Sequence, residues 1–442
     1  MNIAFKCNAR ALMPSAVMLM LIPVAISFAG DAPGELTLAE GLKIAVQSNR
    51  IVSIAAFESA LSSSDIISAR AGMLPRVNAF FNQTMLAHQP GAVMLGRSAY
   101  TAQNSFLSYG VNMRQTLYDF GATGSRYDAA KASLELTRLD TMRIRNLVAL
   151  DFILTYYDLL ESGKMIETAG KDVERLASHL STAQNLFQEG VITKNDLLQA
   201  EVRLSDARQK LFTVKNLREL NASRLNNILA RPLTSEVKAS ETVQEPAVPL
   251  DVESLWDTAV KRRPELEIIA GEIKVTELEE RVKRSEYFPR FFAEGGYNYV
   301  DNRYALHDEN WALVLGLDVN LFSGGATNAA VTKVRHKRSQ LEKRKEKLVE
   351  DIKLEVERAF LDLKSASEKV AVSKDAVGQA DENLRINKVR YEEGIGTATD
   401  VLDAITLLST AETNYCRAGY DLERAQAALL YATGADLPEV YR

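Results

Sequence analysis

The chain has 442 residues, with 53 Lys and Arg against 58 Asp and Glu, so its formal net charge is −5 at pH 7. That length is enough for one large domain or two smaller ones, and an acidic chain is a poor nucleic-acid binder. The two cysteines, Cys7 and Cys416, cannot form an internal disulfide in a chain that loses Cys7 with an export signal.

Residues 1–29 have the pattern of a signal peptide. Lys6 and Arg10 give a positive start, an apolar stretch follows, and Ser27-Phe28-Ala29 resembles a cleavage site. A membrane anchor is the alternative, but two prolines interrupt the apolar stretch. No later stretch approaches about 20 uninterrupted apolar residues, so no membrane-spanning helix is expected after it.

Residues 30–230 form the first of two predicted structural repeats. Leu36 to Leu74 has helical spacing, and Pro75 ends the helix because a residue before Pro avoids helical geometry. Strands are predicted at about 76–87 and 105–118, with a polar loop between them. The second strand alternates clearly. Its apolar face contains Leu107, Tyr109, Val111 and Met113.

A very long helix is predicted from Ala122 to Glu189, since no Pro interrupts it. At 1.5 Å per residue it would be about 100 Å long, which is typical of a coiled coil or a helical tube rather than a compact domain. A turn at 187–198 leads into a returning helix that ends near Leu229. Residues 30–230 therefore end in a long helical hairpin.

After a proline-containing linker at 231–250, the same plan repeats in residues 251–434, and residues 435–442 form a tail. Strands are predicted at about 290–300 and 310–321. The last strand alternates over its whole length, with Asp318 and Asn320 on its polar face. Its apolar face contains Trp311, Leu313, Leu315, Leu317, Val319 and Leu321.

The two hairpin turns, 187–198 and 391–403, are copies of each other. Gly190 corresponds to Gly394 and Thr193 to Thr397, in both cases 204 residues later. Each Gly can adopt the left-handed conformation that ends a helix, and each Thr can cap the next one. Matching landmarks at fixed spacing indicate an internal duplication.

Four strands with lipid-like faces cannot close a barrel alone, and an open sheet edge in a membrane leaves backbone groups unpaired. The chain must therefore oligomerise, since bacterial barrels need about eight strands or more. A dimer would supply eight strands and a trimer twelve. The fold class predicted from these elements is an α+β membrane protein.

The signal peptide, the duplicated helix-strand-strand-helix plan and the Tyr391-x-x-Gly394-x-x-Thr397 tip resemble the TolC family of outer-membrane efflux and export ducts. This resemblance covers nearly the whole mature chain. It implies a homotrimeric channel-tunnel with a 12-stranded β-barrel among outer-membrane lipids and a long antiparallel α-helical barrel across the periplasm. It also implies two partners, a periplasmic adaptor and an inner-membrane pump that is either ATP-driven or of the resistance-nodulation-division type.

Two sets of site residues follow from the tips. Exposed apolar and glycine residues at a hairpin end commonly mark an interface, although a plain turn would have the same composition. The expected adaptor-docking residues are Gly190, Val191, Ile192, Gly394, Ile395 and Thr397. By resemblance, Asp400 and Asp403 line the periplasmic entrance and Tyr391 belongs to its gate. For Asp400 the alternative is simple helix capping.

Other functions fit less well. The four histidines are scattered, and no catalytic or metal-binding motif is present, so neither enzyme activity nor a cofactor is expected. A coiled-coil envelope protein or adhesin would not need the alternating strands, and a porin would not need the long helices. The residues leave the cargo open between drugs, metals and, in type I secretion, proteins.

Overall fold

The computed structural model describes residues 35–241 and 251–442, so the predicted signal peptide and the second half of the predicted linker lie outside the described residues. The helices are α1 (Leu38–Ser48), α2 (Arg50–Ala71), α3 (Ala122–Gln188), α4 (Lys194–Ile228), α5 (Val252–Arg262), α6 (Pro264–Ser285), α7 (Ala326–Glu392), α8 (Ala398–Ala432) and α9 (Leu437–Val440). The strands are β1 (Arg76–Met85), β2 (Gly91–Met94), β3 (Arg97–Tyr100), β4 (Ser105–Tyr118), β5 (Arg290–Val300) and β6 (Glu309–Asp318).

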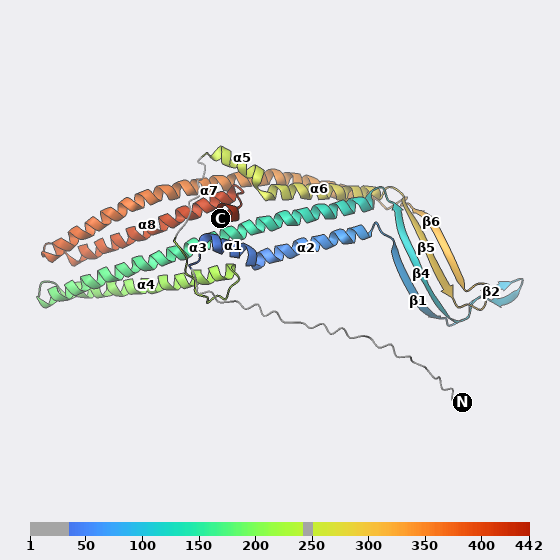
Figure 1. Cartoon of the computed structure of the whole chain (residues 1–442), viewed down its shortest axis with the longest axis horizontal. Helices are drawn as coiled ribbons and strands as arrows, with labels where there is room; N and C mark the ends of the chain where they lie inside the picture. The colour runs from blue at the N-terminus through green and yellow to red at the C-terminus, as the bar shows by residue number, and fades with distance from the viewer. Residues whose placement is uncertain (1–34, 242–250) are drawn as a thin grey trace, which may run out of the picture. The chain divides into compact units, whose positions relative to one another are not determined.

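The two halves of the helical region have matching lengths. Helices α3 and α7 each contain 67 residues, and α4 and α8 each contain 35. At a rise of 1.5 Å per residue, each long helix extends about 100 Å. In Figure 1 the α3–α4 and α7–α8 hairpins lie side by side, with their turns at the same end. Helix α3 packs against α8, which joins the two hairpins.

The main sheet is antiparallel, with the strand order β1-β4-β5-β6. Each half contributes one pair, β1 with β4 and β5 with β6, and the β4–β5 pairing joins the halves. Strands β1 and β6 form the two edges of this sheet, each with one neighbouring strand. The predicted polar loop before β4 is corrected: it contains the β2–β3 hairpin, which extends beyond the sheet in Figure 1.

The predicted continuous helix from Leu36 to Leu74 is also corrected, because the chain breaks at Asn49. Asn49 has extended backbone, with φ −63° and ψ 134°. Its side-chain amide donates to the Ile228 carbonyl at 2.9 Å, and its side-chain oxygen accepts from the Ile51 amide at 2.8 Å. This tertiary contact with the end of α4 stabilises a break that neither Gly nor Pro signals in the sequence.

Among the described helices, α2 alone is long and apolar enough to cross a membrane by length and composition. It was not expected from the sequence as a membrane span. In the structure α2 packs along α3, beside the first part of that helix. Its contact with α3 accounts for one face, and several of its apolar side chains, including Phe57 and Ile67, are exposed in the single chain.

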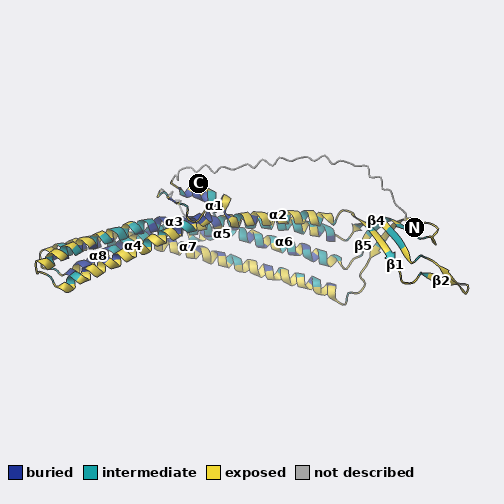
Figure 2. Cartoon of the chain, turned by 90° about the horizontal axis from the view of Figure 1, so that it is seen from below, coloured by how far each residue is buried: buried dark blue, intermediate teal, exposed yellow. Residues whose placement is uncertain are grey.

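The largest core cluster lies where α1 packs on the middle of α3. Phe152, Tyr156 and Tyr157 of α3 are fully buried there. The Tyr156 hydroxyl lies 2.9 Å from the Leu36 carbonyl oxygen, which attaches the start of the described chain to α3. Figure 2 shows buried residues gathered near α1, α3 and α5, whereas the sheet carries exposed and intermediate residues. The helices are therefore held by a core that the sheet lacks.

Candidate functional site

The α7–α8 turn is built by a glycine and a capping box. Gly394 has φ 74°, a left-handed conformation. The Thr397 hydroxyl accepts from the Asp400 amide at 3.2 Å, and the Asp400 carboxylate accepts from the Thr397 amide at 3.0 Å. The pKa of the Asp400 carboxyl is lowered mainly by the hydrogen bond from the Thr397 amide. The Thr397 side chain and the positive charge of Arg390 lower it further. Asp400 therefore carries its negative charge at neutral pH.

The α3–α4 turn has the same geometry. Gly190 has φ 76°, and Thr193 and Asp196 form the equivalent capping box, with the Thr193 amide donating to the Asp196 carboxylate at 3.0 Å. The two turns therefore have the same local structure, as their sequences predict.

The predicted docking residues are mostly exposed at these turns. Val191 is 59% exposed and Ile395 is 71% exposed, so each turn presents one apolar side chain to solvent. Gly190, Gly394 and Thr397 are exposed as well. Ile192 differs, because it is partly buried and packs against the core cluster of the tips.

The three predicted entrance residues differ in burial. Asp400 and Asp403 are both exposed, one turn apart at the start of α8. Tyr391 is only 5% exposed and lies inside the tip cluster. Its ring centroid is 5.4 Å from that of His179 on α3. Burial, and to a smaller extent the charge of Asp196, raise the pKa of the Tyr391 hydroxyl.

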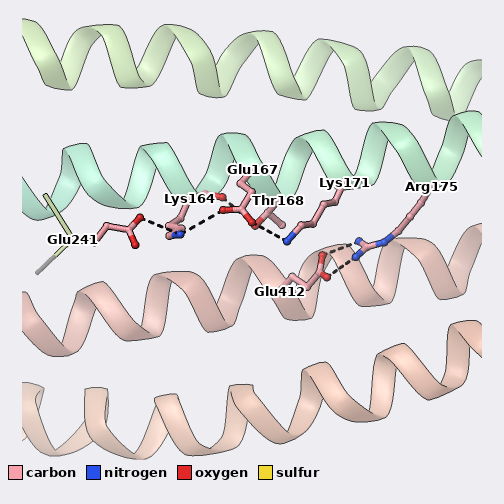
Figure 3. Close-up of polar contacts among 7 residues, drawn as sticks. All are labelled: Lys164, Glu167, Thr168, Lys171, Arg175, Glu241 and Glu412. Atoms are coloured by element: carbon pink, nitrogen blue, oxygen red, sulfur yellow. Dashed lines mark hydrogen bonds and ion pairs between the residues drawn. The ribbon is translucent and has the colours of Figure 1, made fainter. Parts of the chain in front are cut away.

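Sequence reasoning missed the contacts that hold α3 against α8 and the linker. Figure 3 shows Arg175 of α3 paired with Glu412 of α8, with Nη1 and Oε2 2.7 Å apart. Their side chains are only 19% and 21% exposed. Nearer the sheet, Lys164 pairs with Glu241 at 3.0 Å. Arg175 and Glu412 are 237 residues apart, and no local pattern in the sequence connects them.

His179 should make the packing of the tip cluster sensitive to pH. Burial and the nearby charge of Lys388 lower the pKa of His179, and its Nε2 has no partner within the described residues. The unfolded chain therefore binds more protons than the folded chain below about pH 6.5, the ordinary histidine value. Tip packing should weaken as pH falls through that value. Protection factors of α3 amides near His179, which correct for the intrinsic pH dependence of hydrogen exchange, should fall at acidic pH in the natural chain but not in His179→Gln; equal pH profiles would reject this.

The predicted lipid-facing residues of β4 and β6 lie on one face of the main sheet. On β6, Trp311, Leu313 and Leu315 are 77%, 75% and 73% exposed in the single chain. The predicted strand 310–321 is shorter than expected, because β6 ends at Asp318 and the chain then turns at Gly324-Gly325. The remaining members of the set are distributed as follows: Leu317 on β6, Val319 and Leu321 beyond its end, and Leu107, Tyr109, Val111 and Met113 on β4.

No group of three or more His, Cys, Asp or Glu is placed to hold a metal ion within residues 35–241 and 251–442. What the described tips and sheet offer are surfaces: exposed turns, exposed carboxylates and an apolar sheet face.

Known proteins share this architecture. The chain is 23% identical to the alkaline protease secretion protein AprF of Pseudomonas aeruginosa, over 83% of this chain and 77% of that protein. It is 20% identical to the outer membrane efflux protein BepC of Brucella suis, over 77% of this chain and 74% of that protein. The solved Campylobacter jejuni CmeC outer membrane channel superposes with a TM-score of 0.80 at 14% identity, covering 93% of this chain and 90% of that one.

A sequence profile covers both halves of the chain, with the linker between them. The profile is that of the outer membrane efflux protein family, and it matches residues 41–231 and 255–435. The two matched segments correspond to the two predicted repeats. The resemblance to TolC-family ducts is thereby confirmed, and the chain belongs to the outer membrane efflux protein family of channel proteins.

Proposed function

We propose that this protein is a homotrimeric duct in the outer membrane of a Gram-negative type envelope, which passes solutes from a periplasmic adaptor and an inner-membrane pump to the outside. The observation that carries the proposal is the pair of sheet edges, β1 and β6, at the ends of a four-stranded sheet with one apolar face. In a membrane such edges are stable only when another strand pairs with them. Three chains joined β1 to β6 would supply twelve strands.

Protein export is the second candidate, and one relative favours it. The curated protein with 23% identity over 83% of this chain is named for secretion of an alkaline protease. A duct for proteins would work with an ATP-driven pump, whereas drug or metal efflux would also suit a resistance-nodulation-division pump. Another relative, of similar coverage, is named for efflux, so both cargo classes stay within the proposal.

Deletion of the gene tests the proposed export function. Export of drugs, metals or a secreted protein should fall, while uptake of small hydrophilic solutes through the outer membrane should not change. A simple porin would give the reverse pattern. An adhesin or coiled-coil envelope protein would change neither, and a complemented strain provides the control.

The hairpin tips should contact the adaptor. Val191 and Ile395 present exposed apolar side chains at the turns, and such side chains gain free energy when a partner covers them. Cysteine placed at either position should crosslink to a co-expressed adaptor. Cysteine at Leu354, an exposed residue in the middle of α7, is the matched control; crosslinking confined to that position would reject docking at the tips.

The acidic entrance should favour cations. In a trimer, Asp400 and Asp403 would gather six carboxylates around the mouth, and rings of carboxylates select cations. Asp400→Asn with Asp403→Asn removes the charge, and an amide oxygen at the N3 position of the capping box can still accept from the Thr397 amide. Cation preference in planar bilayers should fall in this double variant while trimers still form.

The matched control for the entrance is Asp196→Asn, which removes the equivalent capping carboxylate from the α3–α4 turn. That turn has Gln199 where the other has Asp403. If the control and the double variant shift selectivity equally, or neither shifts it, Asp400 serves only as a helix cap.

A further inference from the structure

Five of the six charged side chains of the main sheet lie at one end of its polar face, and the sixth, Glu309, begins β6 on the other face. The residues of this face alternate with the apolar set that contains Leu313 and Leu315. The charged residues on it are Arg76, Arg114, Arg290, Glu294 and Asp318, which we call the arginine belt. Arg76 and Arg290 begin β1 and β5, and Asp318 ends β6, so the belt lies where the strands join the helices.

Further along the strands, the same face carries amides and hydroxyls instead of charges. These neutral polar residues are Asn78, Asn82, Ser108, Asn112, Asn298 and Asn310. Neutral polar residues would be enough for a face that only contacts water, so contact with water does not explain charged residues gathered at one end of the strands. The arginine belt is therefore a local feature of the end of the sheet next to the helices.

Arg114 lies on the ring of Phe292, which in turn packs against Gly316. Gly316 has no side chain, and a Cβ there would lie 2.4 Å from Cζ of Phe292, so the Phe292 ring rests against the backbone of β6. The Arg114 guanidinium carbon lies 4.3 Å from the centre of that ring. Gly316 thus gives Phe292 the room to support Arg114.

The two carboxylates of the belt make only long contacts with the Arg114 guanidinium. Its Nη2 is 3.4 Å from Asp318 and its Nη1 is 3.8 Å from Glu294, whereas charge-assisted hydrogen bonds are about 2.7–2.9 Å long. Arg290 makes the shorter contact with Asp318, at 2.9 Å. Ion pairs exposed to this extent add little stability. The Arg114 guanidinium therefore keeps N–H donors for another acceptor.

Arg76 lies beside Arg114, because the two residues are directly opposite in the β1–β4 register. Like charges at such positions repel each other. Within the described residues no carboxylate lies within ion-pair distance of Arg76, which is exposed. The belt contains three arginines and two carboxylates, so one positive charge is in excess in each chain. An anion between Arg76 and Arg114 would relieve their repulsion.

We propose that the arginine belt is an anion-binding site on the inner wall of the duct, which takes carboxylate or phosphate groups of solutes in transit. This proposal rests on the proposed function, because the polar face lines the lumen only if the apolar face meets lipid. Guanidinium groups recognise both anions through paired N–H donors. In a trimer the site would recur three times around the wall.

Reconstituted channels in planar bilayers test the site, with inorganic pyrophosphate as the probe. Pyrophosphate should reduce the current of the natural channel at about 0.01 M salt, where the Debye length is about 30 Å, and much less at 1 M. In Arg76→Gln with Arg114→Gln the block should weaken about tenfold or more, since a hydrogen bond to a charged group is worth at least that factor.

Two further variants keep the test decisive. Arg97→Gln removes a positive charge from the β2–β3 hairpin, away from the belt, and should leave the block unchanged. Arg76→Gln alone removes a side chain with little structural role, so it should fold as a trimer and still weaken the block. Conducting natural channels that pyrophosphate does not block, or equal block in the natural channel and the Arg76→Gln variant, would overturn the anion site. If the natural trimer forms no channel at all, the result instead contradicts the proposed duct function and not the anion site alone.

Discussion

Leu315→Arg should destabilise the membrane-inserted protein by about 2–4 kcal/mol, whereas Val314→Arg should be tolerated. A charged side chain on the lipid face of a barrel costs about that much near the bilayer midplane, and much less where water is available. Leu315 is 73% exposed in the single chain, on the same face as Trp311 and Leu313. Refolding into lipid vesicles, followed by denaturant titration, measures the difference.

Val314 is the matched control because it is the next residue of β6 and points to the opposite face. It is paired with Glu294 in the β5–β6 register, so a new arginine there would have a carboxylate beside it. Asp318 would be a poorer control, because it already pairs with Arg114 and Arg290. Equal loss of stability at Leu315 and Val314 would contradict the assignment of faces.

Phe152→Ala should destabilise the helical region by about 3–5 kcal/mol, the usual range for deleting a buried aromatic side chain. Phe152 is fully buried where α1 packs on α3. A Cβ at Gly41 of α1 would lie 2.3 Å from Cζ of Phe152, so Gly41→Ala should also destabilise the fold, by about 1–3 kcal/mol through overpacking.

Combining the two substitutions gives an internal control. Without the Phe152 ring, the new methyl group at Gly41 fits into the space that the ring vacates. Adding Gly41→Ala to Phe152→Ala should therefore cost little more, and the double-mutant cycle should show a clear coupling energy. Thermal unfolding in detergent, followed by circular dichroism, provides the four values. Strictly additive costs would show that α1 does not pack on α3 in this way.

Much of the architecture was predictable because it depends on local patterns. The alternation from Trp311 to Leu317 predicted β6, and Gly190 and Gly394 predicted the two turns. The Thr-x-x-Asp pairs at both turns form the capping boxes that their spacing suggests. Each of these features depends on residues that are close in the sequence, and the duplication repeats each of them.

The features that were missed depend on distant contacts or on weak turn signals. The break at Asn49 is stabilised by the Ile228 carbonyl, 179 residues away. The β2–β3 turn uses Leu95 with φ 49° before Gly96, whereas Asn or Asp would have signalled such a hairpin. Tyr391 was predicted at the gate from resemblance, but its neighbour His179 becomes visible only when α3 and α7 are placed in space.

Single-channel recording of the purified mature chain in planar bilayers tests the central claim most directly. Trimers extracted from the outer membrane should insert as water-filled channels, with stepwise and cation-preferring currents. Trimers that are folded and stably inserted but carry no current at any applied voltage, including after the hairpin tips are cut away, would contradict the duct, because a closed barrel continued by a helical tube must conduct whenever its entrance is open.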